Sequence, residues 1–203
     1  MNPVYNRPLA PIARGVFCPD PCESALLMTV RIAELTDLNA CYAMDGSYTT
    51  NHVWQMQAHE NEQTIEVRFD TVRLPRPMKV AYPRHADELL PNWRQGECFL
   101  VAADNSGQPI GFLDMTAQRW HAVGWIRNLV VDRSHRRRGV ATALLRAARY
   151  LAMDNELDKI MLETQTKNYP AICFALKHRF IFCGYNDRYY SNGDIAVFFS
   201  LTL

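Results

Sequence analysis

Alternating apolar and polar residues predict strands in the first half of the chain. The alternation is clear over residues 28–34 and again over residues 63–74. Pro75 and Pro77 are expected to end the second of these strands, because proline lacks a backbone donor. Residues 48–57 are expected to start a helix, and the prolines further on predict a loop that runs to about residue 96.

Apolar strands and one amphipathic helix dominate the second half of the chain. Residues 98–103 and 110–115 flank a turn and predict a hairpin, and a strand follows over residues 123–131. From Gly139 the apolar positions change to helical spacing. The remaining elements are a strand, a short helix and two closing strands, at residues 159–165, 170–177, 180–185 and 195–203. This order predicts a single mixed α/β (α+β) layer structure.

The amino-acid composition of the chain excludes some classes of binding partner. The 203 residues carry 22 Lys+Arg against 21 Asp+Glu, a net charge of +1. A balanced charge predicts no general attraction to nucleic acid or to anionic membranes. No apolar run approaches the roughly 20 residues that a membrane span needs. Six scattered cysteines without a secretion signal favour reduced thiols and a cytoplasmic location.

Residues 1–27 differ from the rest of the chain in their proline content. They hold five of the eleven prolines, which disfavours regular structure. We therefore expect a proline-rich N-terminal extension over residues 1–27 and one folded domain over residues 28–203.

The most informative segment joins the end of the 123–131 strand to the helix that begins near Gly139. The first turn of a helix offers backbone N–H groups that have no partner within the helix, and its dipole favours anions. Gly139 removes a side chain where an anion would approach, and Arg136, Arg137 and Arg138 add positive charge. This combination is typical of a phosphate or diphosphate site. Neither a P-loop nor a dinucleotide fingerprint is present.

The pattern Arg136-x-x-Gly139-x-Ala141, between a strand and a helix, resembles the acetyl-CoA signature of the GCN5-related N-acetyltransferase (GNAT) family. Downstream, the strand at 162–165, Asn168 and the segment 171–180 resemble the streptothricin-acetyltransferase-like branch. The resemblance implies a mixed sheet of about seven strands with flanking helices, splayed to admit acetyl-CoA.

The resemblance also implies the cofactor contacts. Backbone groups at the end of the 123–131 strand would pair with the pantetheine arm, and one of its N–H groups would stabilise the oxyanion. The N–H groups of the following turn would hold the diphosphate, and an asparagine would contact the cofactor from the next strand–helix junction. The implied residues are Leu129, Val130, Val131, Arg136, Arg137, Arg138, Gly139, Val140, Ala141, Thr142 and Asn168.

Two positions depart from the family pattern. Family members usually carry a tyrosine that protonates the departing thiolate, where this chain has Ala175, and a glycine where it has Arg179. Alanine cannot act as a general acid. Another tyrosine, among Tyr169, Tyr189 and Tyr190, could take this role, or the thiolate could leave without a dedicated acid, or the protein could be a non-catalytic relative.

A general base is also needed, because a free amine is mostly protonated at neutral pH. Glu163 is the first candidate, and Glu66, Asp45 and Asp114 are alternatives. Tyr189 and Tyr169 complete the predicted catalytic set. The acceptor side in this family is built from the first helices, the strand after them and the last hairpin. That assigns substrate binding to four residues that could instead be packing residues, namely Asp45, Tyr48, Trp54 and Tyr190.

These features together predict an acetyl-CoA-dependent N-acetyltransferase that acts by direct attack of a primary amine. The expected acceptor is a small cationic metabolite or a streptothricin-type antibiotic. If the acceptor is the antibiotic, the protein would be an antibiotic-resistance enzyme. The alternatives are a protein lysine or N-terminal acetyltransferase and a non-catalytic acyl-CoA-binding relative. No metal is expected, since no histidine or cysteine spacing indicates one. Whether the protein is a homodimer is left open.

Overall fold

The computed structural model describes residues 28–84, 86–95 and 98–203, and these residues form two compact units. The first unit contains residues 28–46, 84–162 and 201–203, and the second contains residues 47–83 and 163–200. The predicted extension over residues 1–27 lies outside the described residues. No helix in the described ranges is both long and apolar enough to cross a membrane.

The seven-stranded sheet has the order β1-β4-β5-β6-β7-β9-β8. Strands β6 and β7 run parallel, whereas the pairs β1–β4, β4–β5, β5–β6 and β8–β9 are antiparallel. The prediction of a mixed sheet of about seven strands is therefore confirmed. The strands are β1 (Thr29–Ile32), β4 (Cys98–Ala103), β5 (Pro109–Gln118), β6 (Val123–Val131), β7 (Lys159–Gln165), β8 (Ile181–Asn186) and β9 (Ala196–Thr202).

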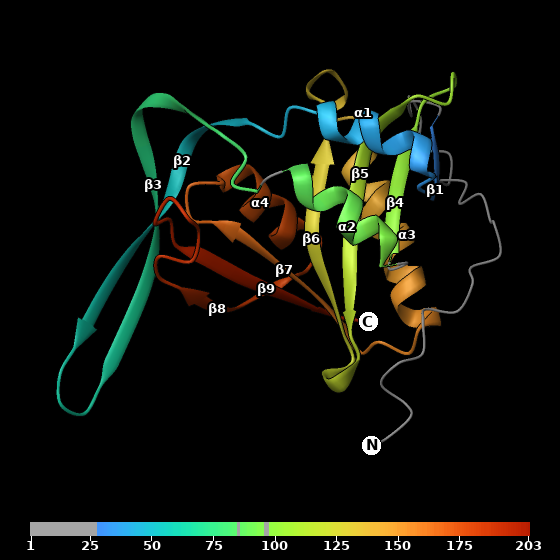
Figure 1. The fold of residues 1–203 in the computed structure, drawn as a ribbon. Coiled ribbons are helices and arrows are strands. Elements are labelled where there is room, and N and C mark those ends of the chain that lie inside the picture. The colour runs from blue at the N-terminus through green and yellow to red at the C-terminus, as the bar shows by residue number, and fades with distance from the viewer. Residues whose placement is uncertain (1–27, 85, 96–97) are drawn as a thin grey trace. The chain divides into compact units, whose positions relative to one another are not determined.

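In the first unit, α3 (Val140–Asp154) covers one face of the sheet, while α1 (Leu38–Ala43) and α2 (Leu89–Arg94) lie on the other (Figure 1). Gly111 of β5 allows close packing on the α3 side, because a Cβ there would lie 2.9 Å from Val140 Cγ1. The buried face of α3 carries the predicted stripe, which includes Leu144, Leu145 and Leu151. Periodicity therefore identified this helix correctly.

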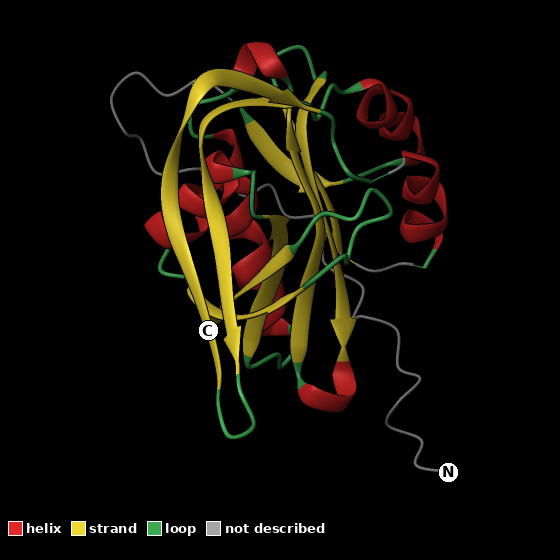
Figure 2. Cartoon of the chain, turned by 90° about the vertical axis from the view of Figure 1, so that its left-hand side faces the viewer, coloured by secondary structure: helices red, strands yellow, loops and turns green. Residues whose placement is uncertain are grey.

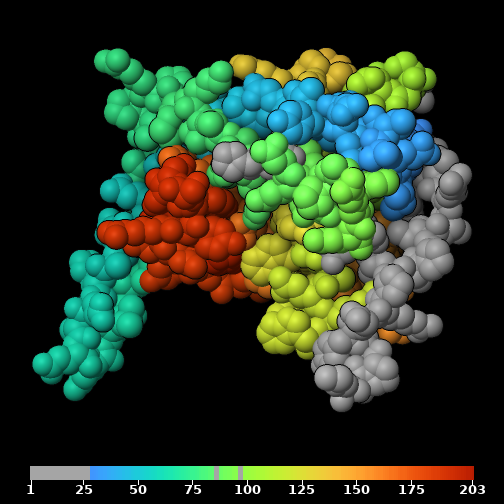
Figure 3. Space-filling model, viewed as in Figure 1, coloured from blue at the N-terminus to red at the C-terminus, as the bar shows by residue number. Residues whose placement is uncertain are grey.

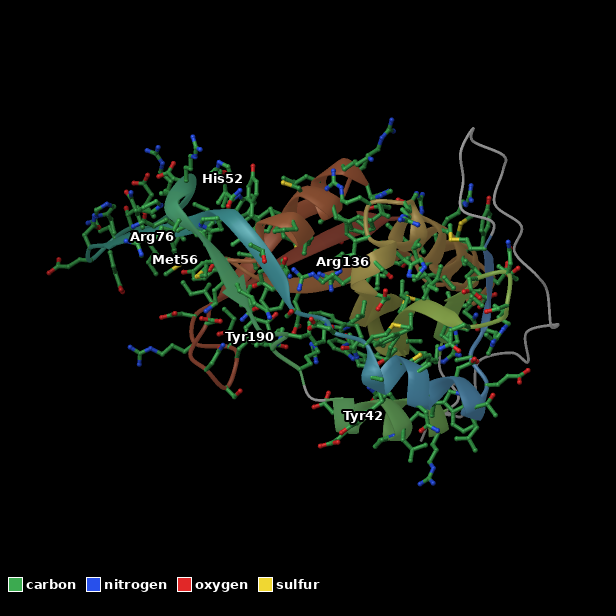
Figure 4. All side chains as sticks on the ribbon, turned by 90° about the horizontal axis from the view of Figure 1, so that it is seen from above. Tyr42, His52, Met56, Arg76, Arg136 and Tyr190 are labelled. Atoms are coloured by element: carbon green, nitrogen blue, oxygen red, sulfur yellow. The ribbon has the colours of Figure 1, made fainter. Side chains whose placement is uncertain are left out.

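The second unit contains a long hairpin, formed by β2 (Tyr48–Glu60) and β3 (Ile65–Val80), and the helix α4 (Tyr169–Lys177) (Figure 2). The space-filling view shows the teal end of this hairpin as a slender arm (Figure 3). His52 and Met56 lie along β2 in the view from above (Figure 4). About midway along the hairpin, where Trp54 pairs with Thr71, the Trp54 ring packs among Phe69, Phe182 and Phe199 at centroid distances of 5.8–6.1 Å.

Two predictions about the hairpin were wrong. Residues 48–57 form strand rather than helix, and β3 continues past Pro75 and Pro77 to Val80. The register explains the second error. Thr50 pairs with Met78 and His52 with Arg73, so residues 74–77 form a bulge in which neither proline needs to donate to the ladder.

The expected loop up to residue 96 was also wrong in part, because it contains α2. Pro91 lies in the first turn of this helix, where a missing N–H group costs little. Four short 3-10 helices complete the described structure, and they are η2 (Leu35–Asp37), η3 (Ala86–Glu88), η4 (Arg119–His121) and η5 (Arg133–His135). The other predicted elements are confirmed to within a few residues.

Candidate active site

Strand β6 parts from β7 halfway along its length. The parallel pairing runs from Val123 to Ile126 of β6. Beyond Ile126, β6 continues to Val131, paired with β5 in the described registers. The change coincides with a bulge at Arg127, because Asp114 pairs with Asn128 whereas Met115 pairs with Ile126. The described β6–β7 registers thus end at Ile126, before Leu129 and Val131, the residues that the resemblance expects to pair with an added extended chain.

The turn after β6 is fixed by side chains of its own sequence. Asp132 accepts hydrogen bonds from the Ser134 N–H (3.0 Å), the Ser134 hydroxyl and His135. The Arg136 guanidinium donates to the carbonyl of Val131 (2.9 Å) and to the carbonyl of Asp45 (2.6 Å). Arg136 therefore anchors the turn, and the carbonyl of Val131 is already engaged.

The start of α3 has the geometry of an anion site. Gly139 caps the helix at φ +86°, and no atom lies within 4 Å of the position that a Cβ would take. The first intrahelical bond runs from Ala143 N–H to the Gly139 carbonyl (3.0 Å), so the N–H groups of Val140 and Ala141 precede the helical ladder. Arg137 and Arg138 are exposed, and Arg137 also has a positive φ, of 65°. The predicted residues Leu129–Val131 and Arg136–Thr142 thus form one continuous strand–turn–helix segment.

Asn168 caps α4 in the second unit. Its side-chain oxygen accepts from the Ala171 N–H at 3.2 Å, and Pro170 lies in the first turn, as predicted. Asn168 therefore has a structural role as the cap of α4.

Glu163 and Tyr189 are hydrogen-bonded in the second unit. The Tyr189 hydroxyl donates to Glu163 Oε2 at 2.8 Å, although the residues lie 26 positions apart. The Tyr189 ring meets Tyr190 and Phe198 edge-on, at 5.2 and 5.6 Å. Tyr189, predicted as a general acid, and Glu163, predicted as the general base, are therefore hydrogen-bonded to each other.

Tyr169 makes different contacts. Hydrogen bonding and charge interaction with Cys173 raise the pKa of the Tyr169 hydroxyl, with some opposition from a hydrogen bond to Thr71. Its ring lies 5.2 Å from that of His52. A raised pKa keeps the hydroxyl protonated at neutral pH, but these contacts do not include Glu163.

Tyr48 belongs to a buried polar network. Its hydroxyl donates to Gln165 Oε1 at 2.9 Å, and the Gln165 amide donates to Asp194. Asp194 also pairs with Lys167 Nζ at 2.7 Å. Burial raises the pKa of Tyr48, and the negative charge of Asp194 adds to the effect.

Sequence reasoning missed Gln165, Lys167 and Asp194 as members of this network. Gln165 is only 1% exposed, at the end of β7. A glutamine at a buried strand position needs hydrogen-bond partners. Gln165 was therefore the one residue whose type could have pointed to this network from the sequence.

The remaining predicted acceptor residues have structural contacts. Trp54 belongs to the aromatic cluster of the hairpin, and Tyr190 is buried with backbone bonds to the Gly193–Asp194 turn. Asp45 is exposed, in the first unit, and its carbonyl holds Arg136. Within the described ranges, no three His, Cys, Asp or Glu side chains gather in an arrangement that could hold a metal ion.

The two departures from the family motif have clear structural settings. Ala175 is completely buried in α4, so a tyrosine there would have to displace its neighbours. Arg179 follows the end of α4 with φ +64°, a conformation that glycine adopts at no steric cost. The chain therefore keeps the backbone turn of the motif without its glycine.

The Acetyltransferase (GNAT) family profile matches residues 65–180, more than half of the chain. The chain therefore belongs to the GNAT acetyltransferase family. It is 31% identical over 186 residues to N-alpha-acetyltransferase 30 of Xenopus laevis, covering 82% of this chain and 65% of that protein. It is 37% identical over 83 residues to streptothricin acetyltransferase A of Bacillus subtilis (strain 168), covering 39% of this chain and 48% of that protein. The chain thus spans less than two thirds of the length of either relative.

Solved structures share the fold. A nourseothricin acetyltransferase superposes with a TM-score of 0.73 at 25% identity, covering 86% of this chain and 98% of that one. A putative streptothricin acetyltransferase of Bacillus anthracis str. Ames, solved with acetyl coenzyme A, gives 0.68 at 23% identity over 89% of this chain and 99% of that chain. The expected family and its α+β fold are confirmed.

Proposed function

We propose that the protein is an acetyl-CoA-dependent N-acetyltransferase that acts on a primary amine. The observation that carries this proposal is the segment from Leu129 to Thr142, in which the end of β6 is followed by a left-handed glycine and a helix N-terminus. The open space beside Gly139 and the exposed Arg137 and Arg138 fit a diphosphate with its negative charge. A relative solved with acetyl coenzyme A supports the choice of cofactor.

When bound, acetyl-CoA supplies an acetyl thioester whose carbonyl carbon a primary amine can attack, forming a C–N bond and releasing the CoA thiol. Glu163 is the proposed base that accepts the ammonium proton of the acceptor. Tyr189, which donates to Glu163, is the proposed source of the proton for the thiolate, taking the place of the tyrosine that Ala175 replaces. Tyr189 then regains a proton from Glu163 through their hydrogen bond, and the second proton of the attacking nitrogen is lost to solvent. Backbone N–H groups at Leu129 or Val130 would stabilise the oxyanion.

The proposed acceptor is a small cationic amine of the streptothricin type. The exposed Tyr189 ring lies beside the Glu163 carboxylate, and an aromatic ring next to a negative charge suits an ammonium group, whereas Tyr190 is buried and packs against Tyr189. Similarity to streptothricin and nourseothricin acetyltransferases supports this choice. Tyr48 would take part through its network with Gln165, whereas the contacts of Trp54 favour a packing role.

A peptide N-terminus is the second candidate acceptor. It is favoured by the similarity to N-alpha-acetyltransferase 30, which extends over 82% of this chain.

We further propose a cytoplasmic location, since six cysteines scattered through a chain of this size favour reduced thiols.

The test measures CoA thiol release from acetyl-CoA by the full chain, with nourseothricin, a polyamine and a peptide with a free N-terminus as separate acceptors. We expect release to depend on nourseothricin or the polyamine. Peptide-dependent release alone would assign the second candidate. A protein that binds acetyl-CoA by calorimetry but releases no thiol above the acceptor-free rate with any amine would be a non-catalytic relative, and the proposed reaction would be wrong.

A further inference from the structure

A buried carboxylate lies where β6 parts from β7. Asp114 of β5 is 1% exposed and faces away from α3, because it alternates with Gly111 and Leu113 on the side that packs against that helix. Its register partner is Asn128, the first residue of β6 after the bulge.

Three donors from two elements converge on this carboxylate. The Arg127 guanidinium donates to Asp114 Oδ1 at 2.8 Å, and Asn128 Nδ2 donates to Oδ2 at 3.1 Å. Asn92 Nδ2, from α2, also donates to Oδ2, at 2.8 Å. Asp114 therefore holds the bulged residue, the residue after the bulge and a helix on the same face of the sheet.

These contacts argue against Asp114 as the general base, which the sequence left as an alternative. Both carboxylate oxygens accept from fixed donors, one of them the charged Arg127, and Asn92 and Asn128 are themselves buried. A carboxylate that is 1% exposed and engaged through both oxygens is poorly placed to reach a substrate amine. Its place at the bulge points to control of geometry instead, since bulges redirect the strand that follows them.

We propose that Asp114 is a positioning residue for acetyl transfer. Its carboxylate fixes the bulge at Arg127 and thereby the direction of the Asn128–Val131 backbone along the edge of β6. This inference rests on the proposed function, because the backbone N–H groups at Leu129 or Val130 are the proposed oxyanion donors. Anchoring the bulge from β5 and α2 keeps these donors in place before substrates bind.

The test compares Asp114→Asn with Asp104→Asn in the full chain. Asp104 accepts from Ser106 and Gln108 in the β4–β5 turn, so its substitution makes the same chemical change in the same hairpin, away from the bulge. For Asp114→Asn we expect kcat with nourseothricin to fall about 100-fold, as for a misplacement of roughly 1 Å. Acetyl-CoA affinity should stay within about threefold, because the proposed diphosphate site lies at the start of α3.

Hydrogen–deuterium exchange of the peptide containing residues 127–131 gives a readout that does not need activity. Asp114→Asn should accelerate exchange in this segment, and Asp104→Asn should leave it at the wild-type rate. A second variant, Asn128→Ala, keeps the Asp114–Arg127 ion pair and covers the case in which Asp114→Asn does not fold. It removes one of the three donors to Asp114 and should therefore show faster exchange and a lower kcat, each to a smaller extent than Asp114→Asn.

The proposal is overturned if the folded variants exchange at the wild-type rate over residues 127–131, or if exchange rises while kcat stays unchanged. If the wild-type protein acetylates no amine, the proposed function fails, and the exchange measurement alone then decides whether Asp114 fixes the bulge.

Discussion

The segment proposed to bind the cofactor and the residues proposed to bind the acceptor are built in different ways. The first is one stretch of chain, from Leu129 to Thr142, and its chemistry comes mainly from backbone groups and a left-handed glycine. The second depends on side chains brought together by the fold, such as Tyr189 with Glu163 and Tyr48 with Gln165, which is 117 positions away. A common cofactor can be bound by a local motif, whereas the acceptor site can change whenever one of several distant side chains changes.

The largest expected effect concerns the proposed base. Glu163→Gln should lower kcat/KM for the amine about 1,000-fold, within the range for loss of a general base, while acetyl-CoA affinity stays unchanged. Steady-state kinetics and calorimetry measure the two quantities. Glu62→Gln, in the exposed turn of the hairpin, is the matched control. If kcat/KM of Glu163→Gln stays near the wild-type value, another group is the base.

Substitutions at the start of α3 should instead affect only the binding of the cofactor. Arg138→Glu combined with Gly139→Asp places two negative charges at the start of α3 and should weaken CoA binding at least about 100-fold. Calorimetry with CoA measures this change. Arg149→Glu with Gly107→Asp is the control, because Gly107 has a similar φ of +84° and equally open surroundings. Unchanged CoA affinity would show that the cofactor site has been misplaced.

A smaller expected effect distinguishes Tyr189 from Tyr169 as the proposed acid. Tyr189→Phe removes the hydroxyl that donates to Glu163 and should reduce kcat about tenfold if this hydroxyl protonates the thiolate. This is less than the usual ~100-fold or more for loss of a general acid, because a thiol of pKa about 8.5 is a fair leaving group. Tyr169→Phe should leave kcat unchanged, because its hydroxyl is engaged with Cys173 and Thr71. The opposite result would move the acid role to Tyr169.

The smallest effect concerns stability rather than catalysis. Arg179→Gly should raise the free energy of unfolding by about 1 kcal/mol, because it relieves a left-handed residue at the end of α4. Lys177→Gly, at the last residue of the same helix, should lower it by no more than about 1 kcal/mol. Denaturant unfolding measures both, and a loss of stability in Arg179→Gly would mean that the arginine side chain makes a stabilising contact.

Much of this contrast could be predicted from the sequence, for physical reasons. The turn around Gly139 and the capping of α4 by Asn168 are local, so residue types at fixed spacing specify them. The strand identity of residues 48–57 depends on pairing with β3 across a four-residue bulge, and no local pattern reports that pairing.

The Tyr48–Gln165–Asp194 network escaped prediction for the same reason. Its members are paired only by the fold. Glu163 and Tyr189 were each chosen on chemical grounds, but their hydrogen bond could not be foreseen, because nothing in the sequence fixes the position of a side chain 26 residues away.

The end of the β2–β3 hairpin offers a practical opportunity. Asn61 closes this turn by accepting from the N–H groups of Gln63 and Thr64, and residues 61–66 are all exposed. An exposed turn with polar residues tolerates inserted sequence better than a packed strand does. A peptide tag or a fluorophore attachment site placed between Glu62 and Gln63 would allow the protein to be immobilised or labelled without touching the residues proposed for catalysis.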